Sequence, residues 1–332
     1  MSRVLINAVS AKNGGARTIV ESLVAATAAF PQHTFIILAG FEPSGRLPSN
    51  VSWHYRPKAG AAAVAFSLFG VAIPYLKHRA DILISFNNIS SPLVSAKRRL
   101  TYFHQLKALD PAFSELKLCV IRLYLRLSRE PIILQSKEVK TAFISMFGNG
   151  VRELIVAWPG ITIPISRGNF QRNSQRILVP VASPQSPHKN FNFIRDVARA
   201  LNGNWHLVVT APDGLVDLGE EATTISFMGL LTREQLFEEY RRATVCLIGS
   251  THETVGLPIF EALAAGTPVV AFDAPYVRAF RDHFGISHGL ILATTPWDAA
   301  AGIKAISRDP ARNITVANDF RQAEWAKILN KI

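Results

Sequence analysis

Residues 244–273, TVCLIGSTHETVGLPIFEALAAGTPVVAFD, decide the fold of this chain. The apolar run 245–248 is short enough for a buried strand. A small polar loop follows, and the tripeptide 256–258 (GLP) then starts an alanine-rich helical segment, where a proline suits an early position because its missing N–H would have no partner there. Gly266 ends that helix and Pro268 begins the next strand. The stretch therefore predicts a strand–loop–helix–strand unit of a parallel sheet.

Two glutamates bracket the start of this helix. Glu253 lies in the loop before it, and Glu261 is expected in its first turn. Free N–H groups at a helix N-terminus suit a phosphate, and an acid on either side fits the hydroxyl groups that flank the diphosphate of a nucleotide sugar. An acid near a helix start is also commonly only a partner of the helix dipole. Taken singly, the glutamates leave both interpretations open.

The whole string S-x-H-E-T-V-G-L-P-I-F-E-A-L-A-A-G-T-P-V-V resembles the signature of the group 1 family of retaining glycosyltransferases (glycosyltransferase family 4-like), which have the GT-B fold. The hallmark of that family is two glutamates separated by seven residues, the spacing of Glu253 and Glu261. The resemblance implies transfer of a hexosyl unit from a nucleotide diphosphate sugar to a hydroxyl of a glycan or lipid-linked acceptor, in cell-surface polysaccharide or glycolipid biosynthesis. It implies that Glu253 orients the sugar and that Glu261 holds the ribose. It also implies that the other donor contacts come from Thr254, Val255, Gly256 and Leu257.

A chain of 332 residues is long enough for about two domains. Alternating apolar runs and helical segments favour doubly wound parallel sheets. We expect an α/β protein of the GT-B fold, with two Rossmann-like domains that face each other across a cleft. The expected boundaries are an acceptor-side domain over 1–160, a linker over 161–175, and a nucleotide-sugar domain over 176–312. By the same resemblance, residues 313–332 form a C-terminal helix that crosses back to the first domain.

Composition narrows the classes of protein. Cys119 and Cys246 lie in apolar runs and are expected as buried reduced thiols, and the N-terminus leads straight into a strand, which together favour the cytoplasm. No GxxxxGK[ST] or GxGxxG string occurs, and no Asp-x-Asp or metal-type cysteine–histidine cluster. We therefore expect no cofactor and no metal, with the nucleotide sugar as a co-substrate.

The first half carries two candidate contacts with substrate. Gly14 and Gly15 follow the first strand, where a glycine pair fits either an ordinary turn or close approach to a phosphate. In the family, a matching loop closes over the donor diphosphate. His104 follows an apolar strand at the carboxyl edge of the sheet, where ligands of α/β proteins bind. It matches the histidine with which the family contacts the sugar or the acceptor.

Charge is concentrated in that first half. Residues 1–160 hold 19 lysines and arginines against 8 acidic residues, a net +11, whereas residues 161–332 hold 17 against 16. Residues 113–129 form a basic amphipathic helix on which Arg122, Arg126 and Arg129 fall within about 60° of one another. A solvated face is the ordinary explanation, and an anionic membrane surface or a lipid diphosphate acceptor is the alternative. The latter would place the protein peripherally on the inner face of the membrane.

The uncharged stretch 59–76 almost has the length of a membrane span. Its many alanines, its glycine and proline, and its place among alternating strands argue against a span. We expect a buried or groove-lining helix, with a helix that dips into a bilayer surface as the alternative.

A further donor contact is expected near the start of the second half. Lys189 lies at the entrance of a helix, where a cation opposes the helix dipole and needs solvent or an anion. In the family a lysine here binds the donor diphosphate, and His188 is its neighbour. The chain departs from the family just before this point, because Val181-Ala182-Ser183 stands where most members have Gly-Arg. That departure leaves open which group replaces the arginine.

Two other functions remain open on sequence grounds. A nucleotide-sugar epimerase of the same fold would use similar geometry without an acceptor. A basic nucleic-acid-binding protein would explain the charge of the first half, but it would leave both glutamates without a role, and no aromatic–basic RNA-binding motif occurs. We expect no nucleic-acid partner.

Overall fold

The structure is a computed structural model, and it divides the chain into two compact units. The first unit is Met1–Gly160 together with Gln322–Ile332, and the second is Ile161–Arg321. The described residues are 1–110, 115–148, 150, 152–164, 175–203, 205–219, 223–308, 314–315 and 319–332. Most of the linker expected over 161–175 therefore lies outside the described residues.

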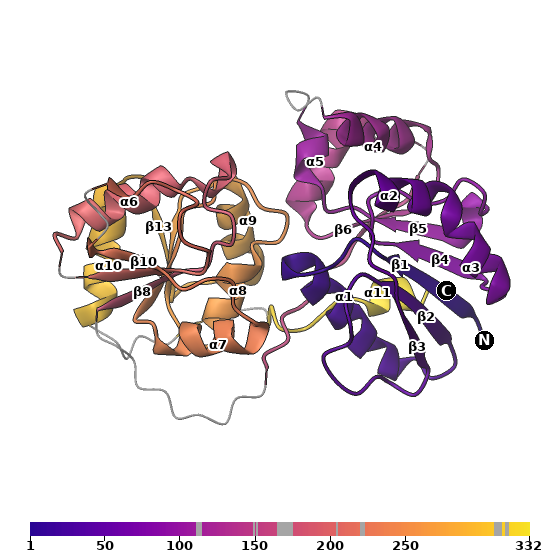
Figure 1. The fold of residues 1–332 in the computed structure, drawn as a ribbon, viewed down its shortest axis with the longest axis horizontal. Coiled ribbons are helices and arrows are strands. Elements are labelled where there is room, and N and C mark those ends of the chain that lie inside the picture. Colours follow the sequence, from indigo (N-terminus) through magenta and orange to yellow (C-terminus); the bar gives the residue numbers. More distant parts are fainter. Residues whose placement is uncertain are drawn as a thin grey trace. The chain divides into compact units, whose positions relative to one another are not determined.

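Each unit is built on one parallel sheet (Figure 1). In spatial order the first sheet consists of β3 (Val51–Tyr55), β2 (Thr34–Ala39), β1 (Arg3–Ala8), β4 (Ile82–Ser85), β5 (Arg99–Tyr102), β6 (Ile132–Leu134) and β7 (Leu154–Val156). The second consists of β10 (Ile225–Phe227), β9 (His206–Val209), β8 (Arg176–Val179), β11 (Val245–Ile248), β12 (Val269–Phe272) and β13 (Leu290–Ala293). The strand order reverses direction between β1 and β4 in one sheet and between β8 and β11 in the other. In open α/β sheets, ligands bind at the carboxyl ends of the strands on either side of such a reversal.

Helices cover both sheets, as parallel strands require. Those of the first unit are α1 (Gly14–Ala26), α2 (Gly60–Ala65), α3 (Ala72–Lys77), α4 (Leu116–Leu127), α5 (Lys137–Phe147) and α11 (Ala326–Leu329). Those of the second are α6 (Phe191–Ala200), α7 (Arg233–Arg242), α8 (Leu257–Ala264), α9 (Pro275–Phe284) and α10 (Pro296–Arg308). In the second unit α6 contacts α10, and α7 contacts α8 (Figure 1). The main core of that unit forms where α6 and α10 pack on β8, β9 and β11.

The predicted strand–loop–helix–strand unit of 244–273 is confirmed as β11, α8 and β12. One detail of that prediction is wrong. Helix α8 begins at Leu257, so Glu261 is its fifth residue and lies beyond the first turn. The helix begins one residue before Pro258, directly after its N-cap Gly256, whose left-handed backbone angles (φ 60°, ψ 37°) a residue with a side chain rarely adopts.

The stretch 59–76 forms a continuous helical segment, α2, a π-helical turn (Phe66–Gly70) and α3. One side packs on β1, β2 and β4 through Val71 and Tyr75. The opposite side is exposed, so the expectation of a buried helix is wrong: Phe69 is 59% exposed, and Ile73 and Leu76 are each 73% exposed. By length and composition alone, Gly60–Lys77 is the one helix among the described residues that could cross a membrane, and 28% of it is buried.

Two smaller expectations also differ. Cys119 is exposed on α4, whereas Cys246 is buried in β11, because the apolar run around Cys119 is one side of an amphipathic helix. The helix expected over 313–332 is only the short α11, and residues 313 and 316–318 of the expected span lie outside the described residues. Residues Gln322–Ile332, which include α11, belong to the first unit, and there the Trp325 indole N–H donates to the Ser22 hydroxyl at 2.9 Å.

Candidate functional site

A pocket in the second unit lies where the sheet order reverses. The loop after β8 carries Lys189 in a short 3₁₀ turn (Pro187–Lys189), and the loop after β11 carries Glu253. Because β8 and β11 are neighbours, both loops emerge at the same edge. The two loops are also joined directly, since the Thr251 N–H donates to the His188 carbonyl at 2.8 Å. The pocket is lined by Val179, Pro180, Val181, Lys189, Ile194, Leu247, Ile248, Gly249, Ser250, Glu253, Gly256, Pro258, Ile259 and Tyr276.

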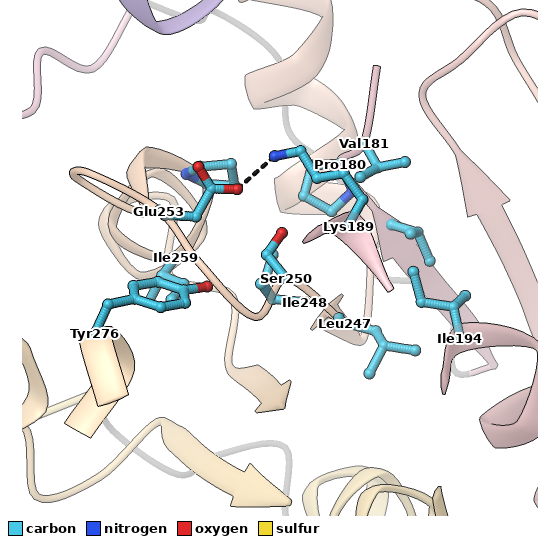
Figure 2. Close-up of a pocket in the computed structure, with 14 residues that line it drawn as sticks. Pro180, Val181, Lys189, Ile194, Leu247, Ile248, Ser250, Glu253, Ile259 and Tyr276 are labelled. Carbon is cyan, nitrogen blue, oxygen red and sulfur yellow. Dashed lines mark hydrogen bonds and ion pairs between the residues drawn. The ribbon is translucent and has the colours of Figure 1, made fainter. Parts of the chain in front are cut away.

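Two of the predicted site residues form an ion pair inside this pocket. The Lys189 ammonium donates to a carboxylate oxygen of Glu253, and the two side chains are 21% and 22% exposed (Figure 2). Because both side chains remain partly exposed, the ion pair orients them without the full cost of desolvating two charges. The pair therefore offers both charges to a ligand that enters the pocket.

The start of α8 lies at the pocket, where Pro258 has no N–H and the Ile259 N–H donates to the Gly256 carbonyl at 3.0 Å. Gly256 lines the pocket, and Thr254, Val255 and Leu257 lie beside it in the chain without being among the lining residues. At an α-helix start the first N–H groups have no partner within the helix and carry partial positive charge. Lys189 and this helix start together make one wall of the pocket suitable for an anion.

Glu261 lies away from that wall, in a buried cluster with α7. It is 5% exposed, its Oε2 accepts from the Tyr240 hydroxyl at 3.4 Å, and its Oε1 lies 3.7 Å from an Arg233 guanidinium nitrogen. Burial raises the pKa of the Glu261 carboxyl, and Arg233 and Tyr240 only partly offset this. Glu261 is not among the residues that line the pocket, so the structure does not bring the two predicted glutamates together there.

The first unit has polar side chains at its own reversal of strand order. Asn7 near the end of β1 donates to the Ser67 hydroxyl at 3.1 Å, and Asn87 and Asn88 follow β4. His104 follows β5 and is held by its backbone, whose N–H donates to Asn88 Oδ1 at 2.7 Å. Burial, helped by the charge of Lys117, lowers the pKa of His104 to about 4, so its ring is neutral near pH 7. The Gly14–Gly15 pair is exposed at the first turn of α1, after β1.

The three arginines expected on one basic face differ in their surroundings. Arg122 donates to the carbonyl oxygens of Lys107 and Ala108, each at 3.1 Å, and to that of Asp110, so it ties α4 to the segment before it. Arg126 is exposed on α4, and Arg129 is exposed just beyond the end of the helix. Only Arg126 and Arg129 present exposed side chains.

Sequence reasoning missed Tyr276, which comes after β12 and completes the pocket. A signal for it was present. Pro275 is the first residue of a helix that follows a strand after two residues, and a proline also stands near the start of α8. Ser250, Pro180 and the apolar lining residues leave no comparable trace, because such residues also fill ordinary cores.

Comparison with known proteins identifies the class of the second unit. Residues 175–309 match the family model described as Glycosyl transferases group 1. Over 160 residues the chain is 27% identical to D-inositol 3-phosphate glycosyltransferase of Mycobacteroides abscessus, covering 42% of this chain and 36% of that protein. Alpha-monoglucosyldiacylglycerol synthase of Streptococcus pneumoniae is 29% identical over 124 residues, 35% of this chain and 25% of that protein. These matches span about a third or less of the relatives' own lengths.

Solved structures extend the likeness to the whole chain. WaaG, a glycosyltransferase involved in lipopolysaccharide biosynthesis, has a TM-score of 0.67 at 14% identity, covering 93% of this chain and 91% of WaaG. Anabaena Alr3699/HepE in complex with UDP-glucose has a TM-score of 0.64 at 17% identity, covering 97% and 94%. These likenesses confirm the predicted GT-B fold. The family match itself is confined to residues 175–309, so it is the second unit that resembles the group 1 glycosyltransferases, as the signature predicted.

Proposed function

We propose that this protein is a retaining glycosyltransferase. It moves a hexosyl unit from a nucleotide diphosphate sugar to a hydroxyl of a glycan or lipid-linked acceptor. The observation that carries this proposal is the pairing of Lys189 with Glu253 beside the Gly256 helix start, in the unit that matches the family. Anabaena Alr3699/HepE, which shares the fold, binds UDP-glucose, which supports a nucleotide sugar as the donor. The comparisons favour neither an epimerase nor a nucleic-acid-binding protein.

Donor binding exchanges the ion pair for contacts with substrate. Lys189 turns to the diphosphate, together with the N–H groups at the start of α8, while Glu253 accepts hydrogen bonds from sugar hydroxyls. Fixed positive groups that face the developing charge stabilise the transition state most when water is excluded. Because Val181 and Ala182 occupy the place of the family's usual Gly-Arg, Lys189 carries more of this task here than in most members.

In the proposed transfer no protein side chain acts as a nucleophile. The bond between the anomeric carbon and the phosphate oxygen breaks, and its electron pair leaves with the nucleotide diphosphate. The acceptor oxygen bonds to the same face of the anomeric carbon, and its proton passes to the departing phosphate. His104, neutral near pH 7, is a hydrogen-bonding group for the sugar or the acceptor rather than a charged one. Within the residues that the structure describes, no three His, Cys, Asp or Glu side chains cluster as metal ligands would, and metal independence is part of this proposal.

The first unit binds the acceptor and docks at an anionic membrane surface. Two contacting helical segments, Gly60–Lys77 and α4, expose a set of large apolar side chains. We call this set the exposed apolar residues; it consists of Phe69, Ile73 and Leu76 of the first segment and Leu116, Leu123 and Leu127 of α4, and the two segments contact each other through α2. Arg126 and Arg129 lie at the same helix, in a half of the chain with a net charge of +11. Apolar side chains flanked by exposed cations are the composition of a segment that lies in the plane of a bilayer surface. This surface supports a lipid-linked acceptor and a peripheral location on the inner face of the membrane.

Thermal unfolding in the presence of UDP, GDP, ADP, CDP and dTDP tests the donor assignment. A ligand that binds only the folded state stabilises it by about 2.7 kcal/mol at 100 times its dissociation constant. We expect one of these diphosphates to raise the melting temperature and Lys189→Ala to remove most of that rise. Incubation of the matching nucleotide sugar without acceptor then separates transfer from epimerisation. If none of the diphosphates protects the protein, the proposed donor class is wrong.

A further inference from the structure

Tyr276 is a buried side chain whose hydroxyl lacks the partner that burial demands. It is the second residue of α9, it lines the pocket, and it is 8% exposed. Its hydroxyl oxygen is inaccessible to solvent and makes no hydrogen bond to any described residue. Figure 2 shows this hydroxyl directed toward the side of the pocket where Ser250 lies.

A hydroxyl in this state costs the folded protein stability. Leaving a buried polar group without a hydrogen bond costs about 1–3 kcal/mol. Phenylalanine would fill the same space without this cost. The free protein therefore gains nothing from the oxygen of Tyr276, and a group that enters the pocket is the remaining source of a partner.

The ring of Tyr276 is fixed against the start of α8. A Cβ atom on Gly256 would lie 3.0 Å from Cε2 of the ring, so the glycine allows the ring to approach the helix start this closely. Because the ring cannot move away without losing this packing, Tyr276 is held against Gly256 at the start of α8.

The charge around Tyr276 keeps its hydroxyl a donor. Burial, and then the nearby carboxylate of Glu253, raise the pKa of Tyr276 well above its ordinary value. The phenol is therefore protonated at any physiological pH. Neutral donors in a shielded site form their strongest hydrogen bonds with ionised acceptors.

We propose that Tyr276 is a substrate-binding residue whose hydroxyl donates a hydrogen bond to an anionic oxygen of the donor's diphosphate. The proposal rests on the function proposed above and adds a third contact to Lys189 and the start of α8. In this assignment, Tyr276 binds the phosphate end of the nucleotide sugar, as Lys189 does. The carboxylate of Glu253 accepts hydrogen bonds from the sugar hydroxyls.

Tyr276→Phe tests this assignment, because it removes one oxygen and keeps the ring packing. Without ligand, the variant should melt at the same temperature as the unsubstituted protein or higher. Its dissociation constant for the protecting nucleoside diphosphate should rise about 10- to 100-fold, as expected for a lost hydrogen bond to a charged group. Both quantities are measured on the full chain, by thermal unfolding and by calorimetric titration.

Tyr75→Phe is the matched control. Tyr75 is also 8% exposed, but its hydroxyl donates to the Asp81 carbonyl at 3.0 Å, in the first unit. Its variant should lose stability and bind the diphosphate normally. Equal diphosphate affinity of Tyr276→Phe and the unsubstituted protein would overturn the assignment and leave the proposed function intact. An affinity loss confined to the nucleotide sugar would place the contact on the sugar and also overturn it. If no diphosphate binds the unsubstituted protein, the proposed function and this assignment fail together.

Discussion

At the scale of single residues, the pocket is defined by how its charges are compensated. Lys189 and Glu253 compensate each other while both remain partly exposed, whereas Glu261 is compensated by Arg233 and Tyr240 in the interior. A partly exposed pair separates at little cost when a ligand offers equivalent contacts. At Glu261, burial disfavours the carboxylate, and Arg233 and Tyr240 only partly offset this. The two glutamates of the signature therefore differ in what their replacement does.

Replacement of Lys189 by alanine should lower turnover by roughly 10²–10³, the usual effect of removing one preorganised donor. The reason is that the chain lacks the arginine that most family members place on the same diphosphate. The measurement is the steady-state rate of the purified variant at saturating donor. Lys304→Ala, which changes an exposed lysine on α10, is the control and should leave the rate unchanged. Near-normal turnover of Lys189→Ala would refute its role and point to His188.

Replacement of either glutamate by glutamine should separate function from stability. Glu253→Gln should mainly reduce kcat, because it misaligns the sugar at the reacting carbon. Glu261→Gln should mainly raise the KM for the donor if Glu261 holds the ribose, since that contact is similar in ground and transition states. A Glu253→Gln protein that melts normally and transfers sugar at the parental rate would contradict the mechanism.

The pH dependence of stability also distinguishes Glu261 from Glu253. Because burial raises the pKa of Glu261, its contribution to stability is present below the unfolded value of about 4.3 and is lost as pH rises through the folded value. At pH 7, Glu261→Gln should therefore be as stable as the unsubstituted protein or more stable, and this advantage should shrink as pH falls toward 4. Melting curves of both proteins between pH 4 and 7 provide the check, with Glu253→Gln expected to show no such trend. A large stability loss in Glu261→Gln at pH 7 that disappears as pH falls toward 4 would show instead that the ion pair with Arg233 dominates.

At the scale of elements, much of the fold could be predicted because parallel strands and their helices have clear patterns. The strand–loop–helix–strand unit predicted over 244–273 is present as β11, α8 and β12. Prediction was weaker where tertiary packing decides. Burial of Glu261 depends on α7, which is distant in sequence from the signature, and Tyr276 reaches the pocket only because β12 lies next to β11. The exposure of one side of Gly60–Lys77 could not be predicted from the sequence, because the same apolar residue types occur at buried and exposed positions.

The exposed apolar residues of Gly60–Lys77 and α4, together with Arg126 and Arg129, lead us to expect membrane binding. Each exposed basic residue near an anionic surface contributes about 1 kcal/mol. Arg126→Glu with Arg129→Glu should therefore abolish sedimentation with vesicles that contain phosphatidylglycerol and leave binding to neutral vesicles unchanged. Arg122 is kept, because it holds backbone carbonyls and its loss would disturb the helix. Ile73→Ser with Leu123→Ser should weaken binding to both kinds of vesicle.

The control for this experiment is Lys304→Glu with Arg308→Glu, an equal change of charge on exposed residues of α10 in the second unit. It should leave vesicle binding as it was. If the Arg126 and Arg129 double variant binds anionic vesicles normally, the basic face is only solvated.

At the scale of the whole molecule, the first unit is assembled from two distant parts of the chain. Trp325 is 1% exposed, its indole N–H donates to Ser22, and its ring lies 5.8 Å from that of Tyr102. Ser22 in turn donates to the Pro159 carbonyl, so one hydrogen-bonded chain joins α1, the end of the first long segment and the C-terminal segment. The second unit is continuous, over Ile161–Arg321.

Trp325→Ala should therefore destabilise the first unit by about 3–5 kcal/mol, the usual cost of truncating a fully buried tryptophan. Differential scanning calorimetry should show one unfolding transition shifted down, while the transition protected by nucleoside diphosphate keeps its temperature. Trp297→Ala, at a 70% exposed position of α10, should shift neither. A single transition that shifts as a whole would show that the two units unfold together.

The divided first unit also has a consequence for the newborn chain on the ribosome. Translation proceeds at about 5–20 residues per second. Since Gly160 and Gln322 bound the second unit, the first sheet emerges roughly 10–30 s before the segment that carries Trp325. During that interval the second unit can fold, but the pocket that receives the indole ring remains uncovered. The part of the protein made first is thus the part completed last, and its apolar interior is the one most in need of a chaperone while synthesis continues.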